Sequence, residues 1–267
     1  MIDETFSLSD EASTDASAKL VENFVSDIQQ LGVSIATEQV AQMLHFCELI
    51  ADYSKHTNLV GNPDISVLLK DHVLDSLTLV PFIRKSLTEN PQRKSSHLID
   101  FGTGAGFPAI VIAIACPELY VTMIEAVGKK CRFLEQACVA LGLVKRTNIY
   151  NERAELLAHD VNFRNRFDFA TARAVANFDI TAEVLLPFLR IGGLFLAQKS
   201  VSQVPDEQIR ATRSLPKLGG VLTGIENLDA NILGKPRALL LATKQSPTKG
   251  LYPRAWGKIK AAPLGDE

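Results

Sequence analysis

Residues 98–108 read Leu-Ile-Asp-Phe-Gly-Thr-Gly-Ala-Gly-Phe-Pro, the most informative segment of the chain. A strand-like run at 97–101 enters a segment with glycine at 102, 104 and 106, and an apolar helix-like run follows at 109–116. In an α/β sheet, this order of strand, glycine turn and helix presents backbone N–H groups and a positive helix end to a nucleotide-like ligand. Glycine is needed because a side chain would block the tight turn or the approach of the ligand. A plain strand–helix turn is the alternative when the glycines are considered alone.

The size and composition of the chain indicate a globular protein. Its 267 residues are 46% hydrophobic and 22% charged, which fits one domain with an appendage or two small domains. No apolar run reaches the ~18 residues that a membrane span needs. Residues 1–16 carry five acidic residues and no Lys or Arg, unlike a signal or transit peptide. The four cysteines lack CxxC spacing and a histidine cluster, so we expect a cytoplasmic protein with no membrane partner and no structural metal.

Charge is distributed unevenly along the chain, although the net charge is only −2. Residues 129–173 contain nine Lys or Arg against five Asp or Glu, and residues 244–260 contain five Lys or Arg and no acid. Basic stretches late in a chain suit a polyanionic partner such as RNA or DNA. Solvated helix faces are the alternative explanation of such charge runs.

Helical patterns fill the first third of the chain. Residues 1–15 are rich in Ser, Asp and Glu and are expected to be a disordered acidic leader. Apolar residues at helical spacing predict helices at 16–31, 37–53, 64–71 and 73–85. Residues 16–92 are therefore expected to be a helical appendage, residues 93–245 an α/β domain, and residues 246–267 a basic, irregular tail.

From residue 97 onward, strands alternate with helices. The predicted strands are 97–101, 120–125, 147–150, 167–173 and 193–199, and the predicted helices between and after them are 109–116, 128–141, 179–189 and 205–214. Such alternation implies right-handed βαβ units and a parallel sheet. Two late strands, 220–226 and 237–243, are close enough in sequence to pair antiparallel. The chain should therefore form a seven-stranded, mostly parallel sheet.

The glycine spacing narrows the choice of nucleotide. Dinucleotide-binding folds carry G-x-G-x-x-G, whereas this chain carries G-x-G-x-G after Asp100, a variant typical of methyltransferases that use S-adenosylmethionine. Glu125 ends the second predicted strand 19 residues after Gly106, where a carboxylate can accept both ribose hydroxyls. A surface residue at a strand end is the alternative for Glu125. We expect a Rossmann-like class I fold that binds S-adenosylmethionine through Glu125 and the turn of Gly102, Gly104 and Gly106.

Further motifs make the chain resemble a known family, the bacterial small-subunit ribosomal RNA methyltransferases that methylate guanine N7 (the RsmG, formerly GidB, family). The resemblance runs from about residue 46 to residue 264. It rests on the following motifs: Asn58-Leu59, His72-Val73-Leu74-Asp75-Ser76, residues 100–108, Gly128-Lys129-Lys130-Cys131-Arg132-Phe133-Leu134, Arg153-Ala154-Glu155, Thr171-Ala172-Arg173-Ala174-Val175-Ala176, Lys199 and Tyr252-Pro253-Arg254. The glycine turn is common to many methyltransferases, whereas Ala-Arg-Ala combined with Tyr-Pro-Arg is more specific.

The resemblance implies the cofactor contacts. In similar proteins they come from the first glycine of the turn, the residue after its last glycine, an Ala-Glu pair and the Arg of Ala-Arg-Ala. Here these residues are Gly102, Phe107, Ala154, Glu155 and Arg173. Two departures are visible: Glu125-Ala126 stands where the family usually has Asp-Ser, and Tyr53-Ser54 stands where Trp-Asn is common. Neither departure removes a side-chain group that cofactor binding or methyl transfer requires.

The resemblance also implies the reaction and the partner, methyl transfer to N7 of a guanosine in 16S ribosomal RNA, free or within the small ribosomal subunit, by a monomer. N7 carries an exposed lone pair, so no general base is obligatory and none of the five histidines needs a catalytic role, although His72 lies in a family motif. Lys199 and Arg173 are the candidates for positioning the substrate. Contacts with RNA phosphates are expected from Lys129, Lys130, Arg132, Arg153, Lys199, Arg254 and Lys258. The alternatives are an S-adenosylmethionine enzyme that acts on another RNA, a small molecule or a protein, and a non-catalytic RNA-binding regulator.

Overall fold

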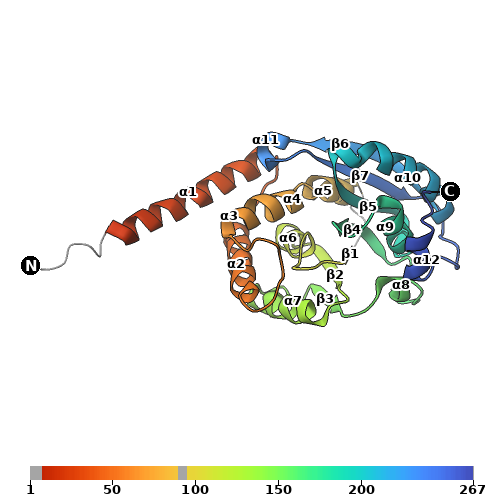
Figure 1. Cartoon of the computed structure of the whole chain (residues 1–267), viewed down its shortest axis with the longest axis horizontal. Coiled ribbons are helices and arrows are strands. Elements are labelled where there is room, and N and C mark those ends of the chain that lie inside the picture. Colours follow the sequence, from red (N-terminus) through yellow and green to blue (C-terminus); the bar gives the residue numbers. More distant parts are fainter. Residues whose placement is uncertain (1–7, 90–94, 267) are drawn as a thin grey trace, which may run out of the picture.

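A seven-stranded sheet forms the centre of the computed structural model, which describes residues 8–89 and 95–266 (Figure 1). Its strands are β1 (Ser96–Phe101), β2 (Leu119–Ile124), β3 (Thr147–Tyr150), β4 (Phe167–Arg173), β5 (Leu189–Ser200), β6 (Gly220–Leu228) and β7 (Arg237–Lys244). They lie in the order β3-β2-β1-β4-β5-β7-β6. Strands β1 to β5 are parallel, and β7 runs antiparallel to β5 and β6. The predicted mostly parallel sheet and its antiparallel late pair are confirmed.

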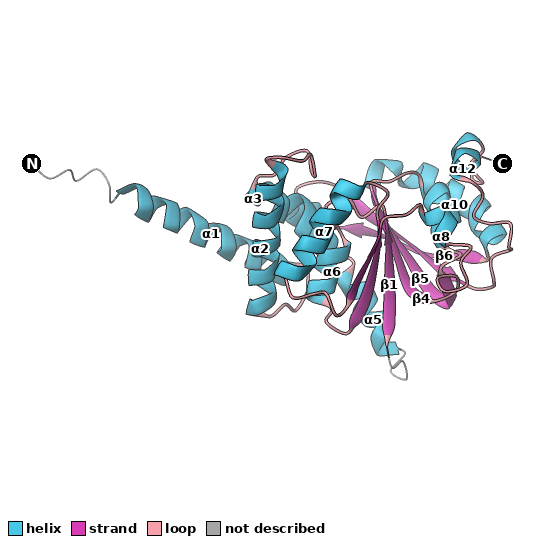
Figure 2. Cartoon of the chain, turned by 90° about the horizontal axis from the view of Figure 1, so that it is seen from below, coloured by secondary structure: helices cyan, strands magenta, loops and turns pink. Residues whose placement is uncertain are grey.

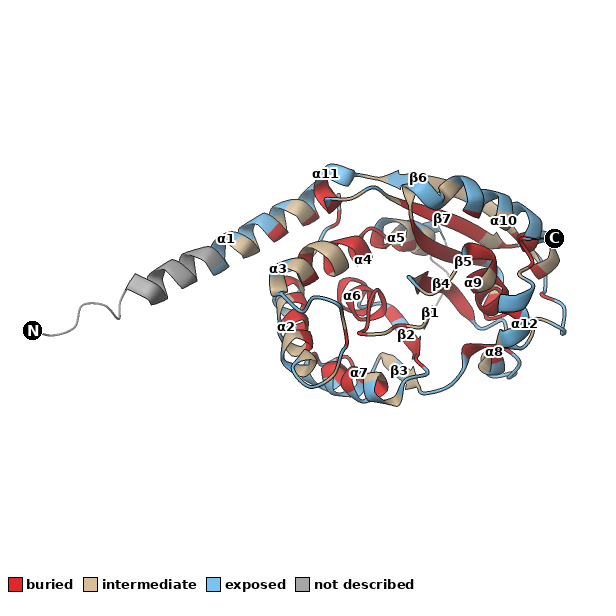
Figure 3. Cartoon of the chain, viewed as in Figure 1, coloured by how far each residue is buried: buried red, intermediate tan, exposed pale blue. Residues whose placement is uncertain are grey.

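Helices cover both faces of this sheet, so its central strands are buried on both sides, whereas the edge strands β3 and β6 are largely half-buried or exposed (Figures 2 and 3). Successive strand residues point to opposite faces; Leu98 accordingly belongs to one apolar core and Ile99 to the other. The first core lies under α6 (Ala109–Ala115) and α7 (Gly128–Ala140). The second core lies under α8 (Ala154–Leu157), α9 (Phe178–Leu185), α10 (Val204–Leu218) and α12 (Trp256–Ala261), and α11 (Ala230–Leu233) joins β6 to β7.

The N-terminal helices share the first core with the sheet. They are α1 (Leu8–Gln30), α2 (Thr37–Ser54), α3 (Ile65–Val67), the π-helical η1 (Leu68–Leu74), α4 (Asp75–Leu77) and α5 (Val80–Glu89). Met43 and Phe46 of α2 are fully buried in the same cluster as Ile110 of α6. The segment expected as an appendage therefore forms part of the layer that covers the sheet, and only the N-terminal part of α1 extends away from the body (Figure 1).

Several element boundaries differ from the sequence expectations. Helix α1 begins at Leu8, inside the leader expected to be disordered; residues 1–7 of that leader lie outside the described residues. Strand β5 begins at residue 189 rather than 193, because Gly192, with φ of +80°, lets the strand continue through a register shift. The tail is not wholly irregular, since α12 interrupts it. Within the described parts of the chain, no helix combines the length and apolar character needed to cross a membrane.

Candidate active site

The glycine turn joins β1 to α6 at the carboxyl ends of the parallel strands. Gly102, Gly104 and Gly106 all have positive φ, at 66°, 60° and 97°. Their amides donate hydrogen bonds inside the chain, to the Ile124 carbonyl, a Glu125 carboxylate oxygen and the Thr103 carbonyl respectively, each at 2.9 Å. The expectation that these N–H groups face a ligand is therefore wrong for the three glycines, whose amides hold the turn itself.

Steric space distinguishes the three glycines from one another. A Cβ on Gly102 would lie 2.9 Å from Val175 Cγ2, and one on Gly106 would lie 2.7 Å from Ile110 Cδ1, so both positions are packed against the chain. A Cβ on Gly104 would meet nothing closer than 3.9 Å, and the Lys130 ammonium lies 4.0 Å from it. Open space at Gly104 is what a ligand approaching the backbone requires.

Asp100 lies directly below the turn and is fully buried at the end of β1. Its Oδ1 accepts a hydrogen bond of 2.7 Å from the Thr171 hydroxyl of β4, while its Oδ2 has no partner among the described residues. Burial, with a smaller contribution from the Glu125 charge, raises the pKa of this carboxyl to about 7; the hydroxyls of Thr103 and Thr171 and the charge of Arg173 act in the opposite direction. A buried, unpaired carboxylate oxygen beside the turn is a suitable partner for a ligand ammonium.

A small cavity of about 190 Å³ opens beside the turn, at the ends of β1 and β2. Glu125, Ala154 and Glu155, three of the residues expected to bind the cofactor, line it, and their contacts with a cofactor stay predictions. The Glu125 carboxylate accepts from the amides of Gly104 and Val127, both at 2.9 Å, and retains two of its four lone-pair sites for a ligand. Glu155 is buried, and its Oε1 accepts a 2.5 Å hydrogen bond from Arg153 Nε.

The C-terminal tail contributes one wall of the small cavity. Trp256 of α12 lines it and meets Phe101 of β1 edge to face, with ring centroids 5.9 Å apart. Sequence reasoning missed Trp256, because the tail was expected to be irregular. The signal was present: this is the only Trp of the chain, two residues after the Tyr-Pro-Arg motif.

A larger cavity of about 480 Å³ lies at the ends of β4 and β5. Its volume falls within the range of small-molecule sites, roughly 300–1,000 Å³. It is lined by Asp71, His72, Ala172, Arg173, Ala174, Val175, Ala176, Asn177, Thr181, Gln198, Lys199, Ser200, Gln203, Lys235 and Arg237. Val175 also packs toward Gly102, a lining residue of the small cavity, so the two cavities are neighbours. Both Arg173 and Lys199 are therefore placed at one cavity, as the sequence predicts.

Arg173 is held by residues of the N-terminal helices. Its Nη1 lies 3.1 Å from Asp75 Oδ2, its Nη2 lies 2.6 Å from His72 Nδ1, and its guanidinium carbon lies 5.2 Å from the centroid of the Phe107 ring. Phe107 is itself buried against Phe46, with ring centroids 5.1 Å apart. The Phe107 ring therefore packs against the Arg173 guanidinium. The predicted contact of Phe107 with a cofactor stays a prediction.

Lys199 is held by an element that the sequence analysis did not connect to the site. Its Nζ lies 2.6 Å from Glu207 Oε1 of α10 and donates to the Ala176 carbonyl at 2.7 Å. The other Glu207 oxygen accepts from the Phe178 amide at 2.6 Å. Glu207 therefore fixes both Lys199 and the loop 174–177 that forms one wall of the larger cavity; no pattern in the sequence marks this residue.

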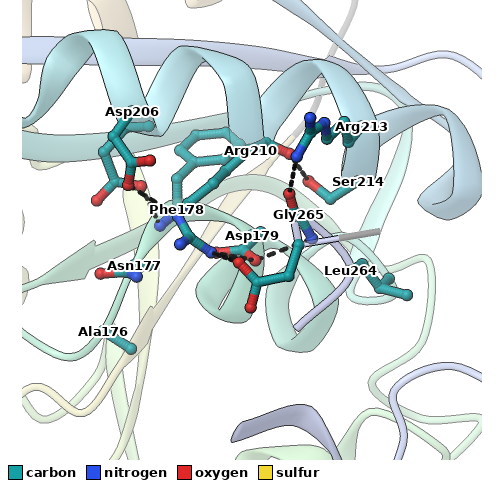
Figure 4. Close-up of polar contacts among 12 residues, drawn as sticks. Ala176, Asn177, Phe178, Asp179, Asp206, Arg210, Arg213, Ser214, Leu264 and Gly265 are labelled. Atoms are coloured by element: carbon teal, nitrogen blue, oxygen red, sulfur yellow. Dashed lines mark hydrogen bonds and ion pairs between the residues drawn. The ribbon is translucent and has the colours of Figure 1, made fainter. Parts of the chain in front are cut away.

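The end of the chain is fastened next to the same loop (Figure 4). Arg210 of α10 pairs with Asp206 at 2.8 Å, Asp266 at 2.6 Å and Asp179 at 3.5 Å. The Gly265 amide donates to Asp179 Oδ2 at 3.0 Å, and a Cβ on Gly265 would lie 2.6 Å from that oxygen. The tail thus closes against the first turn of α9, directly after the loop.

The remaining predicted RNA-binding residues lie in different surroundings. Lys129, Arg132 and Lys258 are exposed, and Lys130 is half-buried beside Gly104. Arg153 is exposed but bonded to Glu155, and Arg254 forms a two-pronged ion pair with the buried Glu183, at 2.8 and 2.7 Å. Their contacts with RNA stay predictions; for Arg254 the structure adds a role in holding the tail to α9.

Comparisons with known proteins agree on one family. The family model described as "rRNA small subunit methyltransferase G" matches residues 39–232 of this chain. A "Ribosomal RNA small subunit methyltransferase G" of Leuconostoc citreum (strain KM20) is 35% identical over 244 residues, covering 91% of this chain and 99% of that protein. A protein of the same name from Chloroflexus aggregans is 36% identical over 234 residues, covering 87% of this chain and 93% of that protein.

A comparison with solved structures supports the fold alone. A crystal structure from Klebsiella pneumoniae described as an O-methyltransferase superposes with a TM-score of 0.51 at 12% sequence identity, covering 82% of this chain and 94% of that chain. The architecture is therefore the Rossmann-like class I methyltransferase fold that the sequence predicts.

Proposed function

Because the chain belongs to the rRNA small subunit methyltransferase G family, we propose that it transfers a methyl group from S-adenosylmethionine to N7 of a guanosine in 16S ribosomal RNA. One structural observation supports this function independently of the family. Two neighbouring cavities lie at the carboxyl ends of the strands, one beside the glycine turn and one lined by Arg173 and Lys199. A methyl donor and a methyl acceptor need such adjoining sites, because their reacting atoms must meet in line.

The residues beside the turn fit S-adenosylmethionine. Asp100 Oδ2, buried and without a partner among the described residues, suits the ammonium of its methionine end. The open space at Gly104 admits the cofactor to the backbone. Glu125 would accept the ribose hydroxyls with its free lone pairs, and Ala154 and Glu155 would meet the adenine edge. The small cavity lies below the usual ligand size range, so the cofactor would extend from it along the turn.

The larger cavity would receive the guanosine. Arg173 is fixed by its bonds to Asp75 and His72, and Lys199 by those to Glu207 and the Ala176 carbonyl. An ammonium has three N–H donors, so Lys199 keeps one for a ligand beyond the two acceptors that the described residues supply. Two rigidly held cations at the cavity can fix a nucleotide phosphate and so position its base.

Chemistry at N7 places few demands on the protein. When bound, S-adenosylmethionine supplies a methyl group on an electrophilic sulfonium. The N7 lone pair is free before attack, so this chain need not remove a proton, and its part is to orient the base and exclude water. The methylated purine carries a positive charge. Asp71 on the wall of the larger cavity pairs with Lys235, and Asp75 behind that wall pairs with Arg173, so the two carboxylates offset the positive charge of the cavity.

RNA around the target would be bound through its phosphates. Exposed Lys129, Arg132 and Lys258 and half-buried Lys130 are available for such contacts, with Arg153 and Arg254 as further candidates that already hold carboxylates. The proposal includes a monomer acting in the cytoplasm, where ribosomal RNA is found.

The test is methyl transfer in vitro with nucleoside analysis. The purified chain is incubated with methyl-labelled S-adenosylmethionine and, separately, with naked 16S ribosomal RNA and with whole small subunits. We expect label in 7-methylguanosine from at least one of these substrates. Label in another nucleoside or in protein would favour another methyltransferase function, and RNA binding without transfer would favour a non-catalytic regulator; either result overturns the proposal.

A further inference from the structure

His72 holds Arg173 at the larger cavity, but the proposed mechanism gives the second nitrogen of its ring no part. It lies in η1, lines the larger cavity, and stacks on the Phe107 ring with centroids 4.9 Å apart and planes inclined by 23°. Its ring orientation is therefore set by packing on one face and by the Arg173 contact at one edge. A side chain held in this way can present its remaining ring nitrogen in a defined direction.

The contact with Arg173 determines which nitrogen of His72 carries the proton. A guanidinium donates hydrogen bonds and cannot accept them, so the 2.6 Å contact from Arg173 Nη2 makes His72 Nδ1 an acceptor. The neutral imidazole must then carry its hydrogen on Nε2. No described residue accepts a hydrogen bond from Nε2, and this nitrogen is not among the buried atoms that lack a partner, so its N–H remains open to a ligand.

The surroundings also keep the ring neutral. Burial and the adjacent Arg173 charge lower the pKa of His72 to about 4, with Lys235 and Arg237 acting in the same direction and Asp71 opposing them. A neutral ring does not repel a purine that becomes cationic at N7. It is also a weaker withdrawer of electrons than a guanidinium, so a hydrogen bond from it costs the N7 lone pair less.

We propose that the Nε2–H of His72 donates a hydrogen bond to O6 of the target guanine and thereby selects guanine over adenine. This inference rests on the proposed function. Guanine carries acceptors at N7 and O6 on one edge, whereas adenine carries an amino donor in place of O6. With Nδ1 occupied by Arg173, His72 offers only a donor to this edge. Adenine would place its donor against the imidazole N–H, and two donors that face each other leave both unpaired.

The test combines a protein substitution with a change of the base. The target guanosine is replaced by 2-aminopurine, which keeps N7 and lacks O6, or by inosine, which keeps both. Methylation is measured as kcat/KM for the wild type, His72→Phe and His72→Gln. His45→Phe is the matched control, because His45 is exposed and its ring nitrogen Nδ1 pairs with Glu48 of the same helix, away from the cavity.

For the wild type, we expect 2-aminopurine to lower kcat/KM about three- to tenfold below inosine, the value of one neutral hydrogen bond. His72→Phe should lower the rate on guanosine and inosine by a similar factor and remove the difference between inosine and 2-aminopurine. His72→Gln, whose amide can accept from Arg173 and donate to O6, should restore part of that difference. His45→Phe should match the wild type.

The ratio of the two base analogues decides the outcome whatever the absolute rates are, so general damage to the fold does not obscure it. An inosine to 2-aminopurine ratio in His72→Phe equal to that of the wild type overturns the assignment. This result is distinct from failure of the proposed function, which would appear as absence of 7-methylguanosine with the wild type and the unmodified RNA.

Discussion

Gly104→Ala separates the ligand role of the glycine turn from its structural role. Gly104 has φ of +60°, and a Cβ there would meet no atom of the chain within 3.9 Å. Gly142, at the end of α7, is the matched control: its φ is +69°, and a Cβ there would also meet nothing within 4 Å. The two substitutions therefore impose the same backbone strain without a steric clash inside the chain.

The cost in stability should be the same for both variants. Placing an alanine in the left-handed region costs ~1–2 kcal/mol. Alanine also lowers the conformational entropy of the unfolded chain relative to glycine, which offsets about 0.4–1 kcal/mol of that cost. The net loss is about 1 kcal/mol, which corresponds to a fall in melting temperature of roughly 2–4 °C for a chain of this size. Urea unfolding and thermal melts measure both quantities.

Cofactor affinity should differ between the two variants. The added methyl group of Gly104→Ala projects into the space through which we propose that S-adenosylmethionine reaches the turn, so its affinity should fall at least about tenfold, or ~1.4 kcal/mol. Gly142→Ala should bind the cofactor like the wild type. Titration calorimetry compares them. Equal affinities for the two variants, at equal stability, would refute the proposed approach of the cofactor to Gly104.

Four further substitutions test buried and exposed charges of the chain. Glu207→Gln leaves the buried Lys199 ammonium without its carboxylate and should lower the free energy of unfolding by about 3–5 kcal/mol in urea; an unchanged value would contradict the pairing. Asp100, with a folded pKa of about 7 against an ordinary aspartate value of 3.8, binds a proton more tightly when folded, so the free energy of unfolding should fall as pH rises from about 4 to about 7. That fall should be absent in Asp100→Asn, and its persistence would assign it to other groups. Arg254→Ala should destabilise the fold by about 3–5 kcal/mol because its carboxylate partner is fully buried. Lys258 is exposed, so Lys258→Ala should instead leave stability unchanged and reduce the slope of log affinity for RNA against log salt by about 0.7–0.9. A loss of stability in Lys258→Ala, with only a change of salt slope in Arg254→Ala, would contradict these roles.

Local sequence patterns were sufficient for the sheet and its turn. Strands β3 and β4 begin and end where predicted, and the other strands differ by one to four residues. The glycines take positive φ because no other residue adopts that conformation without cost. Apolar runs and glycine spacing carry this information within about ten residues of chain, so sequence reasoning reaches it.

The bonds inside the turn were outside the reach of that reasoning. The pattern predicts amides that face a ligand, whereas Glu125 and two carbonyls accept them. The cofactor site that we propose rests instead on the open space at Gly104 and on the oxygen of Asp100 that has no partner among the described residues. Both depend on what surrounds an atom in three dimensions, which residue spacing does not express.

The order of apolar runs and glycines along the chain was enough to predict the α/β class and the strand–turn–helix edge, and the family resemblance added Arg173 and Lys199 as candidate cations of the site. The surroundings of these features depend on long-range packing: Asp75 lies 98 residues from Arg173 along the chain, and Trp256, which lines the small cavity, comes from a tail with no strong periodicity. Periodicity reports which side of an element is apolar, because it arises from local backbone geometry. A charge needs a partner inside the protein only once packing has removed it from water, so that partner can come from any element that the fold brings near it.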